Sequence, residues 1–95
     1  MIKQLTCEDF ATLPKGSLSL EHDGQRIQLQ VVETRALPSG SPRQNPFALV
    51  LIGPASPLLP QGIYGLLHPQ HGRLDLFMVP IGRDASHTRY EIIFN

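Results

Sequence analysis

The sequence predicts a small all-β domain, either an antiparallel sandwich or a partly open barrel of about six strands with one short N-terminal helix. Nine prolines and eight glycines in 95 residues argue against long helices and favour short strands joined by turns. Two runs of alternating polarity flank Asp23-Gly24, which is a strong hairpin signal. Residues 47–52 are apolar throughout, as in a strand that is covered on both faces. A chain of this length has room for one hydrophobic core, so residues 1–95 are expected to form a single domain.

The N-terminal helix is expected within residues 6–14. Thr6 can cap it, and Asp9 lies three residues later, where a capping box has its acidic member. Phe10 belongs to the apolar side of this short element. We therefore expect the helix to cover one end of the sheet.

The first hairpin follows the helix. Residues 18–22 and 27–31 alternate between apolar and polar side chains on the two sides of Asp23-Gly24, and this dipeptide tolerates the positive φ angles of a tight turn. The Val31-Val32 doublet breaks the period of two. It predicts a β-bulge or a change of buried face at that point.

The middle of the chain is expected to pass from a loop into the centre of the sheet. Residues 38–46 are polar and rich in proline, glycine and serine, which is typical of a surface loop. The apolar run 47–52 is the predicted central strand. Residues 54–60 contain three prolines and are expected to form an extended connector outside the ladder.

A second hairpin is predicted in residues 63–79. Its strands, 63–68 and 74–79, are expected to pair across the turn 69–72, and Pro80-Ile81-Gly82 is expected to end the second strand. The alternation places two sets of side chains on opposite faces of that strand: Leu74, Leu76 and Met78 on one, and Asp75, Phe77 and Val79 on the other.

The chain is predicted to end in a core strand. Residues 83–88 are expected to form a surface loop and residues 89–95 the last strand, in which Tyr90, Ile92 and Phe94 share one face. Because those side chains would belong to the core, we expect removal of residues 91–95 to abolish folding.

Composition excludes several classes of function. Eight basic residues balance eight acidic ones, and only 17% of residues are charged, so no electrostatic footprint for nucleic acid or for an anionic membrane is present. Low charge favours burial in an assembly. Cys7 is the only cysteine, which rules out an intramolecular disulfide. Neither a signal peptide nor a membrane-spanning segment is apparent in the sequence, and a cytoplasmic protein is expected.

The sequence contains no pattern typical of a catalytic or metal site. His68 and His71 are separated by a proline and a predicted turn, so they need not converge on a metal ion. The serines lack a nucleophile elbow and the acidic residues are scattered singly. Core packing is the expected role of Phe47, Phe77 and Phe94. We therefore expect a protein that is not an enzyme and that has no catalytic residues, no metal and no cofactor.

Polar side chains within the apolar strands are the remaining candidates for a functional site. One interpretation is structural, with Glu91 hydrogen-bonded to the backbone or to Gln61, because an unpaired buried polar group costs about 1–3 kcal/mol. The other interpretation is a polar patch that recognises a partner or a ligand. The candidate residues are Gln61, Tyr64, His68, Tyr90 and Glu91.

The second half of the chain resembles a bacterial family of small proteins that is described as a domain of unknown function. The resemblance covers the C-terminal half, whereas residues 1–45 are similar only in length and alternation. Ile92 and Ile93 stand where the family has smaller residues. The motifs that carry the resemblance are Phe47-x-Leu49-Val50, Gly53-Pro54, Pro60-Gln61-Gly62, Tyr64, His68-Pro69, Val79-Pro80-Ile81-Gly82, Tyr90-Glu91 and Phe94-Asn95.

The resemblance implies a role without implying a reaction. The family has no assigned catalytic residues, and its members are often encoded beside proteins similar to the collar proteins of phage tail fibres. This implies an accessory or assembly component of a phage-tail-like particle, with a tail-collar-like protein as a partner. The expected function is therefore that of a non-enzymatic structural or interaction protein that binds a protein partner or itself. The alternative is a small-ligand-binding β-barrel with its pocket near Gln61, Tyr64 and Tyr90.

Overall fold

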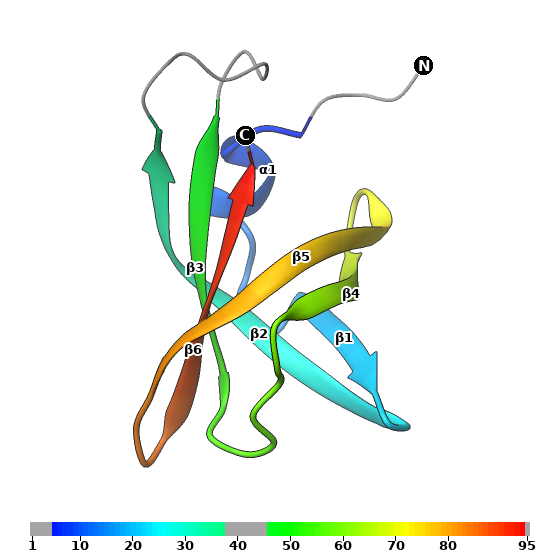
Figure 1. The fold of residues 1–95 in the computed structure, drawn as a ribbon. Coiled ribbons are helices and arrows are strands. Elements are labelled where there is room, and N and C mark those ends of the chain that lie inside the picture. Colours follow the sequence, from blue (N-terminus) through cyan, green and yellow to red (C-terminus); the bar gives the residue numbers. More distant parts are fainter. Residues whose placement is uncertain (1–4, 38–45, 95) are drawn as a thin grey trace.

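The computed structural model describes residues 5–37 and 46–94, and within them six antiparallel strands form a closed barrel (Figure 1). The strand order around the barrel is β1-β2-β3-β6-β5-β4. The all-β class, the small barrel and the short helix predicted from the sequence are confirmed, and the barrel is closed. The elements are α1 (Glu8–Ala11), β1 (Leu18–His22), β2 (Gln25–Ala36), β3 (Phe47–Pro54), β4 (Gly62–His68), β5 (Gly72–Arg83) and β6 (His87–Phe94).

Two long strands, β2 and β5, connect the two halves of the barrel. β2 pairs with β1 up to Leu29 and with β3 from Gln30 onward. β5 pairs with β4 up to Met78 and with β6 from Val79 onward. Each long strand therefore changes partner at its middle, and the barrel closes through the short ladder between β1 and β4.

Both long strands have an irregularity just after the change of partner. In β2 the register shifts between Val31 and Glu33, which confirms the bulge predicted at Val31-Val32. In β5 it shifts between Pro80 and Gly82. A bulge bends a strand and increases its twist, as barrel closure requires. The expectation that Pro80 ends the strand is wrong, because a proline is tolerated where the ladder is interrupted and β5 continues to Arg83.

The Asp23-Gly24 turn agrees with the prediction from the sequence, and the helix α1 agrees with it in part. Asp23 and Gly24 have φ angles of 52° and 78°, as expected for the hairpin turn. The helix begins later than expected, with Cys7 at the N-cap. The Asp9 carboxylate still accepts a hydrogen bond from the Thr6 N–H at 2.8 Å, as the acid of a capping box does. The loop predicted for residues 38–46 falls almost entirely outside the described residues.

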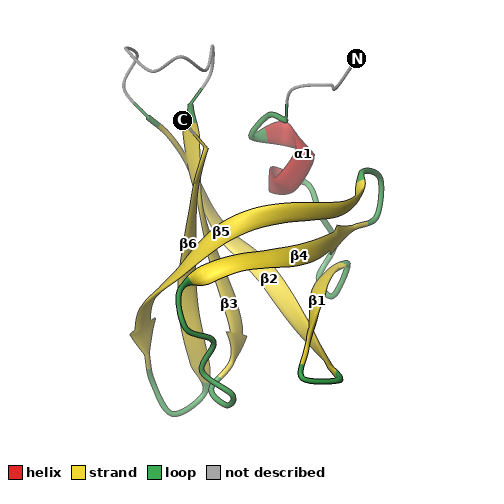
Figure 2. Cartoon of the chain, turned by 45° about the vertical axis from the view of Figure 1, so that its right-hand side comes forward, coloured by secondary structure: helices red, strands yellow, loops and turns green. Residues whose placement is uncertain are grey.

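The core lies inside the barrel and is covered at one end by α1 (Figure 2). Phe10 of α1 is fully buried, and its ring lies 6.2 Å from that of Phe47 and 5.5 Å from that of Phe94. The rings of Phe47 and Phe94 stack at 4.3 Å. The predicted face of the last strand is confirmed, since Tyr90, Ile92 and Phe94 are all buried. That strand begins at His87, two residues earlier than expected.

The strand β3 is buried on both faces, as its continuous apolar run predicts. It lies between β2 and β6, and residues 47–51 are all buried. The neighbouring strands supply antiparallel partners to both of its edges.

Candidate functional site

Tyr90 is a core residue. Its side chain is 1% exposed, and its hydroxyl oxygen accepts a hydrogen bond from the backbone N–H of Leu59 at 3.1 Å. The hydroxyl therefore holds the β3–β4 connector against β6. This contact gives Tyr90 a structural role, whereas the sequence pattern made it a candidate for a binding patch.

Tyr64 lies closer to the surface. Its hydroxyl donates to the backbone carbonyl of Pro60, and its ring meets that of His22 edge-on at 5.9 Å. Burial raises the pKa of Tyr64, and the neighbouring Tyr90 raises it further. A phenol with a raised pKa stays protonated at neutral pH, so Tyr64 acts here as a hydrogen-bond donor.

His68 joins α1 to the turn between β4 and β5. Its Nδ1 atom accepts the backbone N–H groups of Gln70 at 3.0 Å and of His71 at 3.2 Å. Because two donors point at Nδ1, the ring proton resides on Nε2, which donates to the carbonyl oxygen of Asp9 at 2.6 Å. His68 is buried and packs edge-on against Phe10. Both ring nitrogens are occupied, so His68 has no atom left for a ligand.

His71 contacts both His68 and Asp9. Its Nε2 atom lies 3.1 Å from Oδ1 of Asp9, and its ring centroid lies 4.8 Å from that of His68. The two histidines therefore do come together, although a proline separates them. Among the described residues, no group of three or more His, Cys, Asp or Glu side chains is arranged to hold a metal ion.

Glu91 lies on the outside of the barrel and pairs with an arginine from β2. Arg35 donates to the carboxylates of Glu91 and Glu33, each at 3.1 Å. Both glutamates face Val50 of β3 in their ladders, so the guanidinium group spans the central strand. Among the described residues the partner of Glu91 is thus Arg35, and the expected link to Gln61 is wrong.

The five candidate residues do not form one site. Tyr90 and His68 are buried at separate places in the core, Glu91 belongs to an ion pair across β3, and Gln61 is exposed in the loop before β4. The Tyr64 hydroxyl bonds Pro60, the residue before Gln61, and the Tyr90 hydroxyl bonds Leu59. Tyr64, Tyr90 and Gln61 therefore lie around the same connector, whereas His68 and Glu91 lie elsewhere. Tyr90 belongs to the hydrophobic core cluster, and Tyr64 packs against that cluster.

An exposed apolar surface is the first feature that the sequence reasoning missed. Ile63 is 72% exposed, Phe77 52% and Ile93 51%, although Phe77 was expected in the core. Ile63 and Phe77 face each other across the β4–β5 ladder. Val79 opposes Glu91 on β6, two residues from Ile93. We call Ile63, Phe77, Val79 and Ile93 the outer apolar face.

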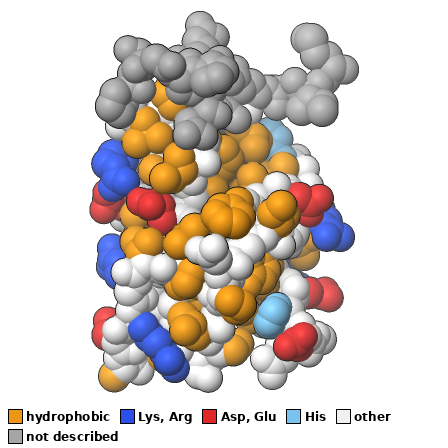
Figure 3. Space-filling view, viewed as in Figure 1, with side chains coloured by type: hydrophobic (Ala, Val, Ile, Leu, Met, Phe, Trp, Pro, Cys, Tyr) orange, Lys and Arg blue, Asp and Glu red, His pale blue; other side chains and the backbone are white. Residues whose placement is uncertain are grey.

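The surroundings of the outer apolar face are polar. Figure 3 shows hydrophobic side chains gathered across the middle of the side on which β5 crosses the barrel, with charged groups toward the two margins. Along β5 the face ends at Asp75, which pairs with Arg73 at 3.1 Å. On β6, Glu91 stands between Val79 and Ile93 at the margin of the face, and it pairs with Arg35.

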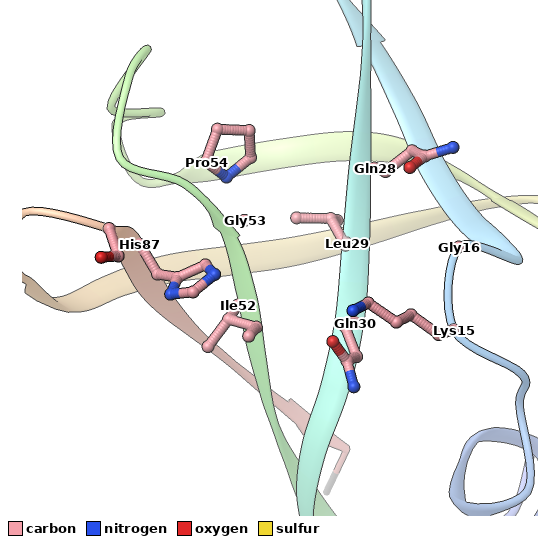
Figure 4. A pocket seen from close by; sticks show the side chains of 10 residues that line it. Lys15, Gly16, Gln28, Leu29, Gln30, Ile52, Gly53, Pro54 and His87 are labelled. Atoms are coloured by element: carbon pink, nitrogen blue, oxygen red, sulfur yellow. The ribbon is translucent and has the colours of Figure 1, made fainter.

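The second feature that the sequence reasoning missed is a groove between β2 and β3, which we call the β2–β3 groove (Figure 4). It has a volume of about 280 Å³. Its floor is apolar and its rim is polar, and the side chains that define it include Lys15, Gln28, Gln30, Leu29, Gly53 and His87. None of the residues that line it is acidic.

Comparison with known proteins gives a family and no activity. No curated protein and no solved structure matches the chain significantly. Within the described residues, no helix combines the length and the apolar character needed to cross a membrane. The profile of one protein family matches residues 5–94, which is nearly the whole chain. The chain therefore belongs to the family described as domain of unknown function DUF6916.

Proposed function

We propose that this domain is a non-enzymatic structural or interaction protein that binds a partner protein through the outer apolar face. The observation that carries the proposal is the exposure of Ile63, Phe77 and Ile93 on the adjacent strands β4, β5 and β6. Isolated exposed hydrophobic residues are common on soluble proteins, whereas a contiguous patch with a polar rim is typical of an interaction site.

The charge pattern supports a protein partner. The charged residues beside the face are held in ion pairs, Arg73 with Asp75 and Arg35 with both Glu91 and Glu33. An apolar centre surrounded by paired charges matches the anatomy of protein interfaces, where aromatic residues are enriched and charges are depleted at the centre. Phe77 is the natural anchor because it is the aromatic member of the face.

The closed barrel favours contact through side chains. Strand addition requires an exposed sheet edge, and here the strands are joined into a ring. We therefore expect side-chain packing on the outer apolar face to provide most of the binding energy, in preference to added backbone hydrogen bonds.

We further propose that the partner is a component of a phage-tail-like particle, such as a tail-collar-like protein. The resemblance of the C-terminal half to the bacterial family supports this partner, and the low charge of the chain suits a protein that works inside an assembly. The proposed role is accessory or concerned with assembly.

Co-purification tests the proposal. The domain is co-expressed with a tail-collar-like protein, as the unaltered chain, as Phe77→Ser and as Val32→Ser. Val32 is also exposed but lies on β2, outside the face. We expect the unaltered chain and Val32→Ser to retain the partner and Phe77→Ser to lose it. Ile63→Ser provides a second variant on the neighbouring strand, and thermal unfolding shows that each variant is folded.

Two results decide against parts of the proposal. A chain that remains strictly monomeric when dilute and retains no particle component contradicts the interaction role. A homodimer that Phe77→Ser disrupts, without binding of the collar-like protein, identifies a second copy as the partner and contradicts the particle component.

A further inference from the structure

The β2–β3 groove arises where two paired strands separate. The ladder between β2 and β3 runs from Ala36↔Phe47 to Gln30↔Ile52. Beyond Ile52, β3 continues along β6 to Pro54, whereas β2 continues toward its start along β1. The strands therefore diverge at Gln30 and Ile52, and the groove occupies the space between them.

The floor of the groove is apolar. Leu29 and Gly53 lie side by side, and a Cβ atom at Gly53 would come within 3.0 Å of Cδ2 of Leu29. The absence of a side chain at Gly53 therefore leaves Leu29 room to lie against β3. Pro54 extends the apolar surface along β3.

The polar groups converge on this floor from opposite sides. Figure 4 shows the Lys15 side chain extending as far as β2, where it ends beside Gln30, and the His87 imidazole directed toward the gap from β6. Gln30 adds an amide group near the end of Lys15. A lysine ammonium group and an amide N–H are donors that suit an anion.

Nothing in the lining opposes a negative charge. The lining contains no Asp or Glu. The carboxylate of the adjacent turn, Asp84, accepts the backbone N–H groups of Ser86 and His87, each at 2.8 Å. These hydrogen bonds lower the pKa of Asp84 and hold the turn that presents His87 to the groove.

We infer that the β2–β3 groove binds a short-chain aliphatic carboxylate. The carboxylate group lies between Lys15 and the Gln30 amide, beside His87, and the aliphatic chain lies along Ile52 and Pro54, above the buried Leu29 and Gly53. A volume of about 280 Å³ is just below the usual range of ligand sites, about 300–1,000 Å³, and it suits a ligand of this size. The inference is independent of the outer apolar face, because none of the groove residues belongs to that face.

Titration with sodium hexanoate, followed by two-dimensional amide NMR, tests the inference. We expect saturable shifts at Gln30, Gly53 and His87 with a Kd of about 1 mM, the affinity of a small ligand with few contacts. Lys15→Met keeps the aliphatic stem and removes the charge, and it is expected to weaken binding about tenfold. Arg26→Met removes an equal charge from outside the groove lining and is expected to leave binding unchanged.

Three results would overturn the inference. The first is the absence of saturable shifts in the groove at tens of millimolar hexanoate. The second is an equal response to hexanol or hexylammonium, which would show that the charge is not recognised. The third is an equal loss of binding in Lys15→Met and Arg26→Met, which would indicate a general effect of net charge.

Discussion

The backbone N–H of Leu59 donates a hydrogen bond to the hydroxyl oxygen of Tyr90 at 3.1 Å, within the barrel core. Both residues are buried, and Leu59 lies in the connector between β3 and β4, outside the strand ladders. A buried N–H that has no strand partner needs another acceptor. The Tyr90 hydroxyl provides it, so a polar group of β6 determines where the connector enters the core.

Tyr90→Phe is expected to destabilise the fold by about 1–3 kcal/mol, because it leaves the buried N–H of Leu59 without its acceptor. Chemical denaturation of both proteins measures the difference. Tyr64→Phe is the matched control, since the Tyr64 hydroxyl bonds the exposed carbonyl of Pro60 and water can replace it. Equal losses in the two variants would contradict the structural role assigned to Tyr90.

Gly53→Ala is expected to destabilise the fold by about 1–3 kcal/mol through overpacking. The added Cβ would meet Cδ2 of Leu29 at 3.0 Å and Cε2 of Tyr90 at 3.5 Å, and both neighbours are buried. Gly62→Ala is the control on β4, where the nearest contact would be 3.9 Å from Tyr64. We expect that substitution to be neutral or slightly stabilising, and thermal unfolding compares the two. A neutral Gly53→Ala would mean that the Leu29 side chain can move aside without cost, which would contradict overpacking at this position.

Asp9 gives the fold a dependence on pH. The backbone N–H of Thr6 lowers the pKa of Asp9 most, burial opposes this effect, and the hydrogen bond from His71 lowers the pKa further. A carboxyl group whose pKa is lowered by folding stabilises the native state above its unfolded-state pKa of about 3.9. This contribution is lost as the pH falls from about 4 through the lowered folded-state pKa.

Asp9→Asn is therefore expected to reduce the free energy of unfolding by about 1 kcal/mol at pH 7, with a smaller difference from the unaltered chain near pH 3. Urea denaturation at both pH values measures it. Asp75→Asn removes an equal charge from an exposed ion pair with Arg73, and it reports the effect of losing a negative charge at the surface. A difference between Asp9→Asn and the unaltered chain that stays constant from pH 7 to pH 3 would exclude the proposed contribution of the ionised carboxylate.

The features that the sequence predicts well are local. The Asp23-Gly24 turn needs positive φ angles that these two residues tolerate, and the Val31-Val32 doublet interrupts the alternation where β2 has its bulge. The alternation of β6 also suffices to identify the buried face that carries Tyr90. Each of these conclusions depends on residues that are neighbours in the chain.

The candidate site depends on distant pairings, which local patterns do not specify. Arg35 and Glu91 are 56 positions apart, and their contact follows only from the register of β2, β3 and β6. In β5 both faces carry apolar side chains, so alternation separates Met78 from Phe77 without showing which one faces the core. Closure of the barrel buries Met78 and exposes Phe77.

Removal of residues 91–95 is expected to abolish cooperative folding. The deletion removes Ile92 and Phe94 from the core, together with the stacking of Phe94 on Phe47 at 4.3 Å. It also removes the part of β6 that pairs with residues 47–50 of β3, and loss of buried Ile or Phe side chains costs about 2–5 kcal/mol each. Because a domain of this size has a total stability of only about 5–15 kcal/mol, calorimetry of the truncated chain should give no unfolding transition. Deletion of Asn95 alone leaves all the described residues of β6, His87–Phe94, in the chain, and it is the control that should retain the transition. A cooperative transition in the longer truncation would refute the assignment of β6 as an essential core strand.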